Sequence, residues 1–482
     1  MNNPNGSRLS LQAVTRAVLA TAVLILLFFT AGCGDHSTTQ PTPTPTPVGT
    51  TSTQLRIGDA PADKVLSFEL TIASPIVATV SGSSTPVNIT VGNNRLELSH
   101  MAGKLEALGV LNIPQGTYTS AQFTITNPEM VYLDANNAIT KLQGSPTQTV
   151  TVNFNPPVTI GSAPGLVNVD LSIANSLATD PSGNITGFNF SSSSFTITTN
   201  AIGPQNGQQE DDNGEMENVT GLVTAVNAPN FTLHVGQSGA DLVFTTDANT
   251  QFSDGVTDLA STLNKIVKVE GVTRGDGTLY AKEVEGIENE AGAEVEGLIT
   301  TVTGLPATSF TLMAQDGVGS GVDGTKVGDT FTIDVSALTD SEYTVDLGNC
   351  DTSNLQIGGV DFPFDSSHIK PGQRVEVETT TAVPAANGTI VAAKVKLQQR
   401  ALTGTVSNFV AGTGTAATFD LTVPADSHFA ILSGQTVVHV FQQPGTHNKV
   451  GTIANGATVR VRGIPFWTGT TFNMIARRIT AP

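Results

Sequence analysis

The stretch VTGLVTAV at residues 219–226 begins a pattern that occurs three times in the second half of the chain. The opening returns as VEGLIT at residues 295–300 and as LTGTV at residues 402–406. Each copy later contains a run that alternates apolar and charged residues: VKVEG at 267–271, VEVE at 375–378 and VRVRG at 459–463. An ordered recurrence of this kind indicates tandem repeats of one structural unit.

Each repeat contains about five short strands that alternate apolar and polar residues. Glycine-bearing turns, such as those at Gly277 and Gly388, precede the last strand of a copy. A small closed barrel suits such strands because closure removes exposed sheet edges. We therefore expect three barrels, at residues 219–288, 294–399 and 401–482.

The second copy departs from the compact pattern between residues 315 and 365, where an extra hairpin or a mobile loop would fit. The repeat as a whole resembles the family called Domain of Unknown Function 5666. This resemblance implies barrels similar to oligonucleotide-and-oligosaccharide-binding (OB) barrels, and it assigns no chemistry to them.

A second strand-rich region, residues 54–203, precedes the repeats. The runs LSFELTI at residues 66–72 and SAQFTI at residues 120–125 alternate apolar and polar side chains, which predicts strands with one buried face. Between them, apolar residues at helical spacing predict one short helix within residues 98–108.

Two turns are predicted from composition, GDAP at residues 58–61 and IPQGTY at residues 113–118. The second resembles the proline-glycine-tyrosine turn of transthyretin-like sandwiches, where glycine allows the bend and tyrosine packs on the sheet. The series of turn, strand, helix and second turn resembles the family Domain of Unknown Function 4382, found in bacterial lipoproteins. This resemblance covers residues 53–199, implies a β-sandwich and assigns no activity. We interpret Asp59 as a carboxylate that closes its turn, with ligand binding as the alternative.

Composition favours an all-β chain and argues against nucleic-acid binding. Of the 482 residues, 39% are hydrophobic and only 13% charged, and 48 are glycine, which favours strands and turns over surface helices. The chain has 22 Lys and Arg against 41 Asp and Glu, and this net charge of -19 repels nucleic acid.

Residues 1–32 have the organisation of a lipoprotein signal peptide. Two arginines and no acidic residue accompany an apolar run at residues 17–29, and TAGC at residues 30–33 resembles the lipobox of bacterial lipoproteins. This resemblance implies cleavage before Cys33, a diacylglyceryl thioether on Cys33 and an acylated new amino terminus. The alternatives are an ordinary signal peptide with an incidental cysteine, or an uncleaved anchor.

Residues 33–53 form a tether that is rich in proline and threonine, and residues 204–218 form an acidic linker. Proline at every second position of PTPTPTP, residues 41–47, enforces an extended chain, with a ligand for a proline-recognition domain as the alternative. Glycine follows the cysteine, where aspartate would favour the inner membrane. We therefore expect a cell-envelope protein that is anchored by lipid in the outer membrane.

No catalytic or cofactor-binding set emerges from the motifs. The run GSGVDG at residues 319–324 matches the dinucleotide fingerprint, but the TFTI that follows at residues 330–333 is a strand where that site needs a helix N-terminus. No serine lies in a nucleophile-elbow frame, and no histidine pair has zincin spacing. Cys350 has no partner in the mature chain, so a quiet thiol is expected, with an intermolecular disulfide as the alternative. We expect neither catalysis nor a cofactor.

Metal binding is not predicted. His428, His439 and His447 have no standard ligand spacing, and His439 is expected to face solvent or form a hydrogen bond from a strand. Carboxylates crowd residues 210–217 and 283–296, where oxygen ligands would suit calcium. Calcium-loop spacing is absent there, so solvated acidic segments are the default interpretation.

The third repeat reverses the charge of the chain. From residue 401 onward, basic residues outnumber acidic ones: Lys449, Arg460, Arg462, Arg477 and Arg478 against Asp420 and Asp426. Packing against acidic modules is the preferred interpretation. We hypothesise a non-enzymatic scaffold with an envelope protein or polysaccharide as its partner. The alternative is a module that binds envelope polysaccharide or another anionic ligand through the basic third barrel.

Overall fold

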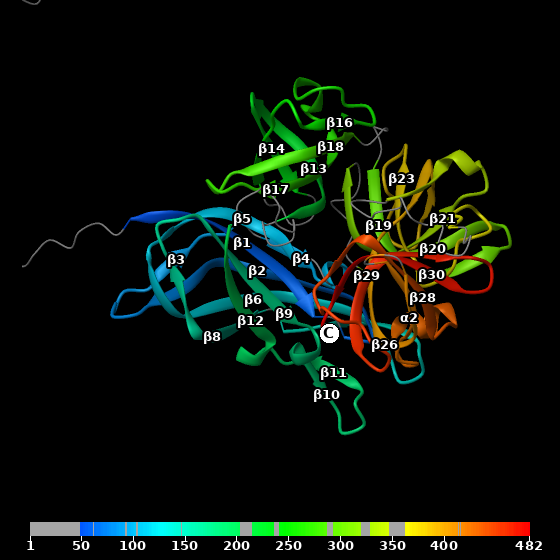
Figure 1. Ribbon diagram of the computed structural model, residues 1–482, viewed down its shortest axis with the longest axis horizontal. Coiled ribbons are helices and arrows are strands. Elements are labelled where there is room, and N and C mark those ends of the chain that lie inside the picture. Colours follow the sequence, from blue (N-terminus) through cyan, green and yellow to red (C-terminus); the bar gives the residue numbers. More distant parts are fainter. Residues whose placement is uncertain are drawn as a thin grey trace, which may run out of the picture. The chain divides into compact units, whose positions relative to one another are not determined.

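The computed structural model describes residues 49–482, apart from 61, 92–93, 103–104, 146, 203–214, 236–240, 287–292, 320–327, 347–361, 413 and 415. Nearly every regular element in this part of the chain is a β-strand, as Figure 1 shows. The α-helix of the described residues, α2 (His428–Ser433), has six residues. The predicted all-β class is confirmed.

Two sheets face each other in the first folded module, which we term the sandwich. The first sheet has the order β12-β9-β1-β5 and consists of β1 (Thr50–Ala60), β5 (Leu105–Pro114), β9 (Gly165–Ser172) and β12 (Phe195–Ala201). The second sheet is built on β2 and β6 and consists of β2 (Val65–Val80), β3 (Val87–Ile89), β4 (Asn94–Glu97), β6 (Gly116–Leu133), β7 (Ile139–Gln143) and β8 (Thr147–Ile160). A small hairpin adds β10 (Leu177–Thr179) and β11 (Ile185–Phe188).

Burial alternates along β6, which confirms the period-two prediction for residues 120–125. The single buried face expected for residues 66–72 is wrong over the first part of β2, where residues 65–70 are buried on both faces and Leu66 packs against Leu298 and Met313 of the second barrel.

The inward side chains of β2 and β6 meet those of the other sheet in one apolar core, where Phe123 of β6 stacks on Phe195 of β12 with ring centres 5.1 Å apart. Tyr118 is buried in the same core and its hydroxyl donates a hydrogen bond to the carbonyl oxygen of Pro114, at 2.6 Å. The predicted turn before β6, with its tyrosine on the sheet, is therefore present.

Two further local predictions for the sandwich are wrong. The helix expected within residues 98–108 is a single 3-10 turn, Ser99–Met101, followed by strand β5. Pairing of β5 with β1 outweighs the helical spacing of its leucines. The turn expected at residues 58–61 is also displaced, because β1 continues to Ala60 and pairs there with β9.

The first barrel closes a five-stranded ring in the order β13-β14-β15-β18-β17. Its strands are β13 (Met216–Asn227), β14 (Asn230–Val235), β15 (Asp241–Thr245), β16 (Gln251–Ser253), β17 (Ile266–Thr273) and β18 (Leu279–Gly286). Pairing in the ring is antiparallel except between β15 and β18, which are parallel. Strand β16 pairs with β18 outside the ring.

The second and third barrels repeat this connectivity. In the second, β21 and β24 form the parallel pair, and its strands are β19 (Ala293–Gly304), β20 (Ala307–Gly319), β21 (Thr330–Asp334), β22 (Tyr343–Val345), β23 (Arg374–Thr379), β24 (Thr389–Val391) and β25 (Lys394–Leu397). The third is a closed barrel with the order β26-β27-β28-β30-β29, formed by β26 (Arg400–Ala411), β27 (Ala417–Thr422), β28 (Val437–Asn448), β29 (Thr458–Trp467) and β30 (Phe472–Thr480). Three small barrels with an OB-like ring therefore follow the sandwich.

Part of the stretch expected as an insertion, residues 315–365, belongs to the second barrel. Strand β20 runs into it, and β21 takes the place that β15 has in the first barrel. The segments that lie outside the described residues are 320–327 and 347–361. The helix α2 was not expected, although Ser427 caps its start and Gly434, with φ of 70°, follows its end.

A glycine in the first strand of each barrel allows close approach of the neighbouring backbone. A Cβ at Gly221, Gly297 or Gly404 would collide with the carbonyl oxygen of His234, Met313 or Thr422, respectively. This contact explains why the repeated openings share their glycine.

Replacement of Gly297 by alanine is expected to lower the free energy of unfolding by about 1–3 kcal/mol. The backbone carbonyl of Met313 cannot rotate away from the new Cβ as a side chain could. Thermal denaturation of the purified chain measures this effect. Gly275→Ala is the control, because no atom lies within 4 Å of a Cβ there. Equal melting temperatures for the two variants would contradict the assigned role of Gly297.

Candidate functional site

A stripe of charged side chains crosses the outer face of the second barrel. Glu296 of β19 pairs with Glu376 of β23, which in turn pairs with Lys396 of β25. Alternation along each strand places their neighbours Val295, Val375, Val377 and Val395 in the barrel core. The charged residues therefore project outward. Two residues further along the strands, a second row on the same face consists of Glu294, Glu378 and Lys394.

The first barrel carries a matching stripe at the same positions of its fold, with the charges exchanged. Lys268 of β17 pairs with Glu285 of β18, where the second barrel has Glu376 and Lys396. The two stripes meet: Lys268 forms an ion pair with Glu376, and Nζ of Lys396 lies 2.8 Å from Oε1 of Glu285. The two barrels thus dock through reciprocal ion pairs between equivalent strands.

Both partners of the central ion pair are buried. The exposed fractions of the Lys268 and Glu376 side chains are 4% and 1%. Burial opposes the charged form of Glu376, but Lys268 and Lys396 outweigh it and lower the pKa of Glu376 to about 2. Burial likewise opposes the charge on Lys268, whereas Glu376 and Glu294 raise its pKa well above the ordinary value. Each charge therefore depends on the other.

The surroundings of Glu294 oppose its charged form. Burial first, and then the neighbouring Glu376, raise the pKa of Glu294 well above its usual range. Glu294 hydrogen-bonds Glu376 and helps to keep it ionised, while Oε2 of Glu294 is buried without a hydrogen-bond partner. A proton on Glu294 relieves the repulsion between the two carboxylates.

Carboxylate oxygens of Glu294, Glu296 and Glu376 lie within 4.8 Å of one another, close enough to hold a metal ion. Oxygen ligands of this kind suit calcium or magnesium. In the described arrangement, however, Lys268 contacts Glu376 and Arg374 contacts Glu296. Ammonium and guanidinium groups supply the positive charge that a cation would bring.

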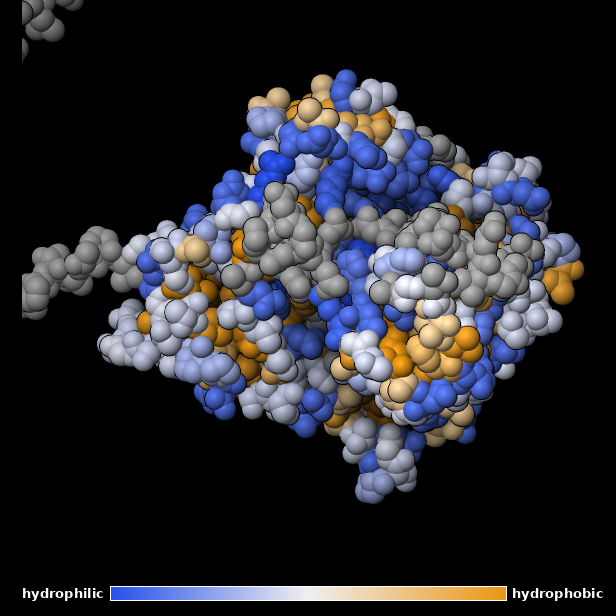
Figure 2. All heavy atoms as spheres, viewed as in Figure 1, coloured by the Kyte–Doolittle hydropathy of each residue, from blue (hydrophilic) through white to orange (hydrophobic). Residues whose placement is uncertain are grey.

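A polar cavity of about 320 Å³ lies beside the paired stripes. On the face shown in Figure 2, hydrophilic residues gather where the first barrel meets the second. The cavity is lined by side chains of both barrels: Ser253, Asp254, Lys268, Glu270, Glu283, Glu285, Thr344, Val345, Asp346, Lys394 and Lys396. Carboxylates outnumber lysines in this lining, so its field opposes anionic ligands.

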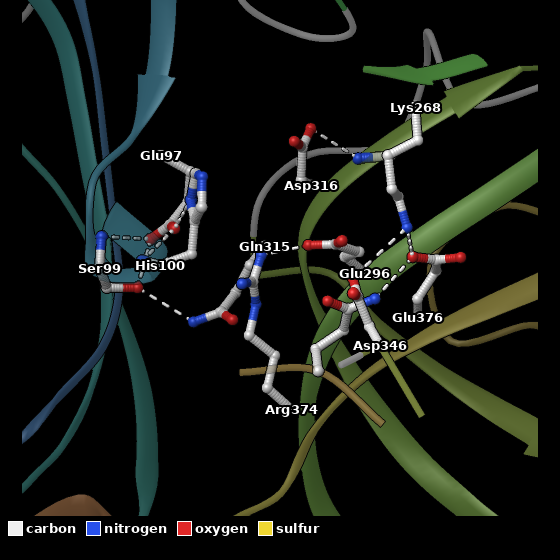
Figure 3. A network of polar contacts seen from close by, with 12 residues as sticks. Glu97, Ser99, His100, Lys268, Glu296, Gln315, Asp316, Asp346, Arg374 and Glu376 are labelled. Carbon is white, nitrogen blue, oxygen red and sulfur yellow. Dashed lines mark hydrogen bonds and ion pairs between the residues drawn. The ribbon is translucent and has the colours of Figure 1, made fainter. Parts of the chain in front are cut away.

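The polar network continues to the sandwich, as Figure 3 shows. Nε2 of Gln315 donates to the carbonyl oxygen of Leu66 at 2.8 Å and to the hydroxyl of Ser99 at 3.0 Å. In the sandwich, the two ring nitrogens of His100 each lie 2.8 Å from a carboxylate oxygen, one of Glu97 and one of Glu106. Beside this junction, burial raises the pKa of Asp316 to about 6.

Arginines of the basic third barrel contact other modules. Arg477 is buried and its guanidinium lies 3.1 Å from Oε1 of Glu215, whose other oxygen lies 3.7 Å from Arg478. Arg462 donates to the carbonyl oxygen of Ala102 in the sandwich, at 3.1 Å. Arg462, Arg477 and Arg478 therefore take part in contacts within the chain.

Two of the histidines of the third barrel have different partners. His428 contacts Arg400 at 2.8 Å, whereas His439 lies in β28 and contacts Asp420 at 2.7 Å. The prediction for His439 as a hydrogen-bonded strand histidine is confirmed. The sequence-predicted Cys33, with the whole leader, and Cys350 lie outside the described residues, as does the side chain of Asp59.

Sequence reasoning missed the site at the barrel contact, although its signal is present. The runs VKVE at residues 267–270 and VEVE at residues 375–378 occupy the same place in their repeats, and the second position of the run is a lysine in one and a glutamate in the other. An outward-facing charge that reverses between copies marks a surface on which one copy can dock on the other.

Comparison with known proteins supports a family for the first barrel. Residues 220–285 match the family described as "Domain of unknown function (DUF5666)", a stretch that includes Lys268 and Glu285. A solved chain entitled "drosophila Unr CSD456" is 11% identical and the match covers 55% of this chain and 98% of that chain, with a TM-score of 0.12. At this TM-score the similarity carries no argument about function. No curated protein matches the chain.

A membrane-spanning helix is absent from the part of the chain that the structure describes. None of the helices there is long and apolar enough to cross a bilayer.

Proposed function

We propose that this chain is a non-enzymatic scaffold of the cell envelope, anchored by lipid on Cys33 and holding its folded modules together through charged contacts. The observation that carries the proposal is the pair of charge-exchanged stripes, in which Lys268 meets Glu376 and Lys396 meets Glu285. These charged side chains form ion pairs between two modules of the same chain, so they are not free to bind a substrate.

The proposal includes the assignments made from the sequence. The sandwich is a domain of the family Domain of Unknown Function 4382, and the tether at residues 33–53 separates it from an outer-membrane anchor. An envelope protein or polysaccharide is the partner. Leu305 and Val410, which are 83% and 61% exposed, are suitable sites for photo-crosslinkers that would identify it in intact cells.

Binding of an anionic polysaccharide by the third barrel remains the second candidate. The sequence alone supports this candidate more strongly than the contacts do, because Arg462, Arg477 and Arg478 contact other modules. A glycan array probed with the purified chain at low salt separates the two candidates. Retention of acidic glycans that is lost in Arg460→Gln would favour the binding module.

An enzyme would be recognised by turnover that depends on the buried carboxyls. The purified chain is expected to leave peptidoglycan and envelope polysaccharides intact. Hydrolysis that disappears in Glu294→Gln, a variant expected to keep its fold, would overturn the scaffold proposal.

Cys33→Ser is expected to move the protein from the membrane fraction to the soluble fraction, because the sulfur that carries the lipid is lost. Several acyl chains on one residue make attachment effectively stable, at about 0.8 kcal/mol for each buried methylene. Fractionation and mass spectrometry of the amino-terminal peptide measure the change, and Cys350→Ser is the control. Unchanged processing and membrane attachment in Cys33→Ser would contradict the anchor.

A further inference from the structure

Arg400 is a buried cation at the start of β26. It is 7% exposed, and its guanidinium donates to the carbonyl oxygen of Gly372, contacts Nε2 of His428 at 2.8 Å and lies 5.0 Å from the ring centre of Phe429. No carboxylate pairs with it among the residues that the structure describes. A buried charge without a counter-ion is unfavourable, so this arrangement requires an explanation.

The surroundings of Arg400 add positive charge instead of compensating for it. Burial, followed by the nearby Arg374, lowers the pKa of Arg400 to about 9. Burial and Arg400 together lower the pKa of His428 to about 3, so the imidazole is neutral and accepts a hydrogen bond from Arg400. Arg374 already pairs with Glu296, which leaves one uncompensated positive charge.

A cavity of about 50 Å³ lies at this position, between the sandwich and the second and third barrels. Its lining includes Arg400, Arg374, Gln399 and His428. The Nε atoms of both arginines and Oε1 of Gln399 are buried without a hydrogen-bond partner. Two arginines that line this one small space thus each keep an N–H donor without a partner.

We propose that this cavity binds one small inorganic anion, held by the guanidinium groups of Arg400 and Arg374. Guanidinium N–H groups are strong donors to anions, and a cavity needs only about 10–15 Å³ to hold one water, so a cavity of about 50 Å³ suits an anion of few atoms. One net positive charge favours a halide, whereas a tetrahedral oxyanion would use both arginine forks. The bound anion would join three modules of the fold.

Thermal denaturation of the purified full-length protein tests the proposal. A gluconate buffer of fixed ionic strength provides a reference anion that is too large for the cavity, and chloride, sulfate or inorganic phosphate replaces gluconate in separate arms. We expect the melting temperature to rise with anion concentration and to saturate, because a ligand that binds only the folded state stabilises it. A rise with chloride alone identifies a halide site, and a rise with sulfate or phosphate alone identifies an oxyanion site.

Variants assign the effect to the cavity. Arg400→Gln should weaken the apparent affinity for the anion by at least about tenfold, and Arg400→Lys, which restores the charge, should recover part of it. The control Arg274→Gln removes an arginine that pairs with Asp247 in the first barrel, and it should retain the full response. An equal response of Arg400→Gln and the wild type would overturn the proposal.

A direct measurement covers the case in which Arg400→Gln does not fold. Anomalous diffraction from wild-type crystals grown with bromide should place a bromide ion in contact with Arg400. Diffraction that locates no bromide there, together with melting that depends only on ionic strength, would also overturn the proposal.

Discussion

Replacement of Lys268 by methionine is expected to lower the free energy of unfolding by about 3–5 kcal/mol, which is typical when one partner of a buried ion pair is removed. Methionine keeps the length and the apolar stem of lysine but leaves the ionised Glu376 without its closest cation. Lys396, at 3.5 Å from Glu376, and Asp346, at 3.8 Å from Lys268, remain in place. Urea denaturation of the purified chain measures the loss.

A double-mutant cycle shows whether the loss comes from the contact between barrels. Glu376→Met should be destabilising alone, whereas Lys268→Met with Glu376→Met should recover part of the stability, because neither member of the pair is then left as a buried charge without the other. Lys265→Met is the control, at a half-buried lysine just before the same strand whose Nζ donates to the carbonyl oxygen of Gly255, and it should cost less than about 1.5 kcal/mol. Additive effects of the two single replacements would contradict direct pairing.

Most strands could be predicted from the sequence because a single rule produces them. Alternation places Val267 and Val269, or Val375 and Val377, in a barrel core, and this does not depend on what covers the outer face of the strand. Alignment of the repeats strengthens the prediction, because the same pattern occurs in each copy. Local spacing failed at residues 98–108, where pairing of β5 with β1 outweighed the helical pattern. That pairing joins distant segments and leaves no local signal.

The site at the barrel contact could be predicted only in part. The positions of Lys268 and Glu376 on outward faces follow from alternation, and their opposite charge is visible in the aligned repeats. The burial of these two side chains is not visible in the sequence, because an outward-facing charge on an alternating strand is expected to lie in solvent. Arg400 illustrates the same limit: nothing in the run QQRAL at residues 398–402 indicates that a neighbouring module covers the guanidinium.

Because of its buried carboxyl groups, the folded chain should be most stable at mildly acidic pH and should lose stability both at lower and at higher pH. Glu376, with its pKa lowered to about 2, contributes stability that is present above its ordinary value of 4.5 and is lost as the pH falls toward 2. Glu294 acts in the opposite direction. Its raised pKa means that the unfolded chain releases a proton above pH 4.5 that the folded chain retains, so stability falls as the pH rises through this range. Asp316, Asp346 and Glu378, whose pKa values are also raised by burial, add to this fall.

Glu294→Gln should therefore stabilise the protein above pH 4.5, with a gain that increases by about 1.4 kcal/mol per pH unit until Glu294 itself ionises in the folded chain. Glutamine cannot ionise, but its amide can still donate to Glu376 as the protonated carboxyl does. Melting curves between pH 3 and pH 9 in roughly one-unit steps compare the variant with the wild type, and Asp241→Asn, at a side chain that is 64% exposed, is the control. Parallel curves for Glu294→Gln and the wild type would show that Glu294 is ionised in the folded protein. Lys268, Lys396 and Arg374 would then have to compensate for the repulsion among Glu294, Glu296 and Glu376.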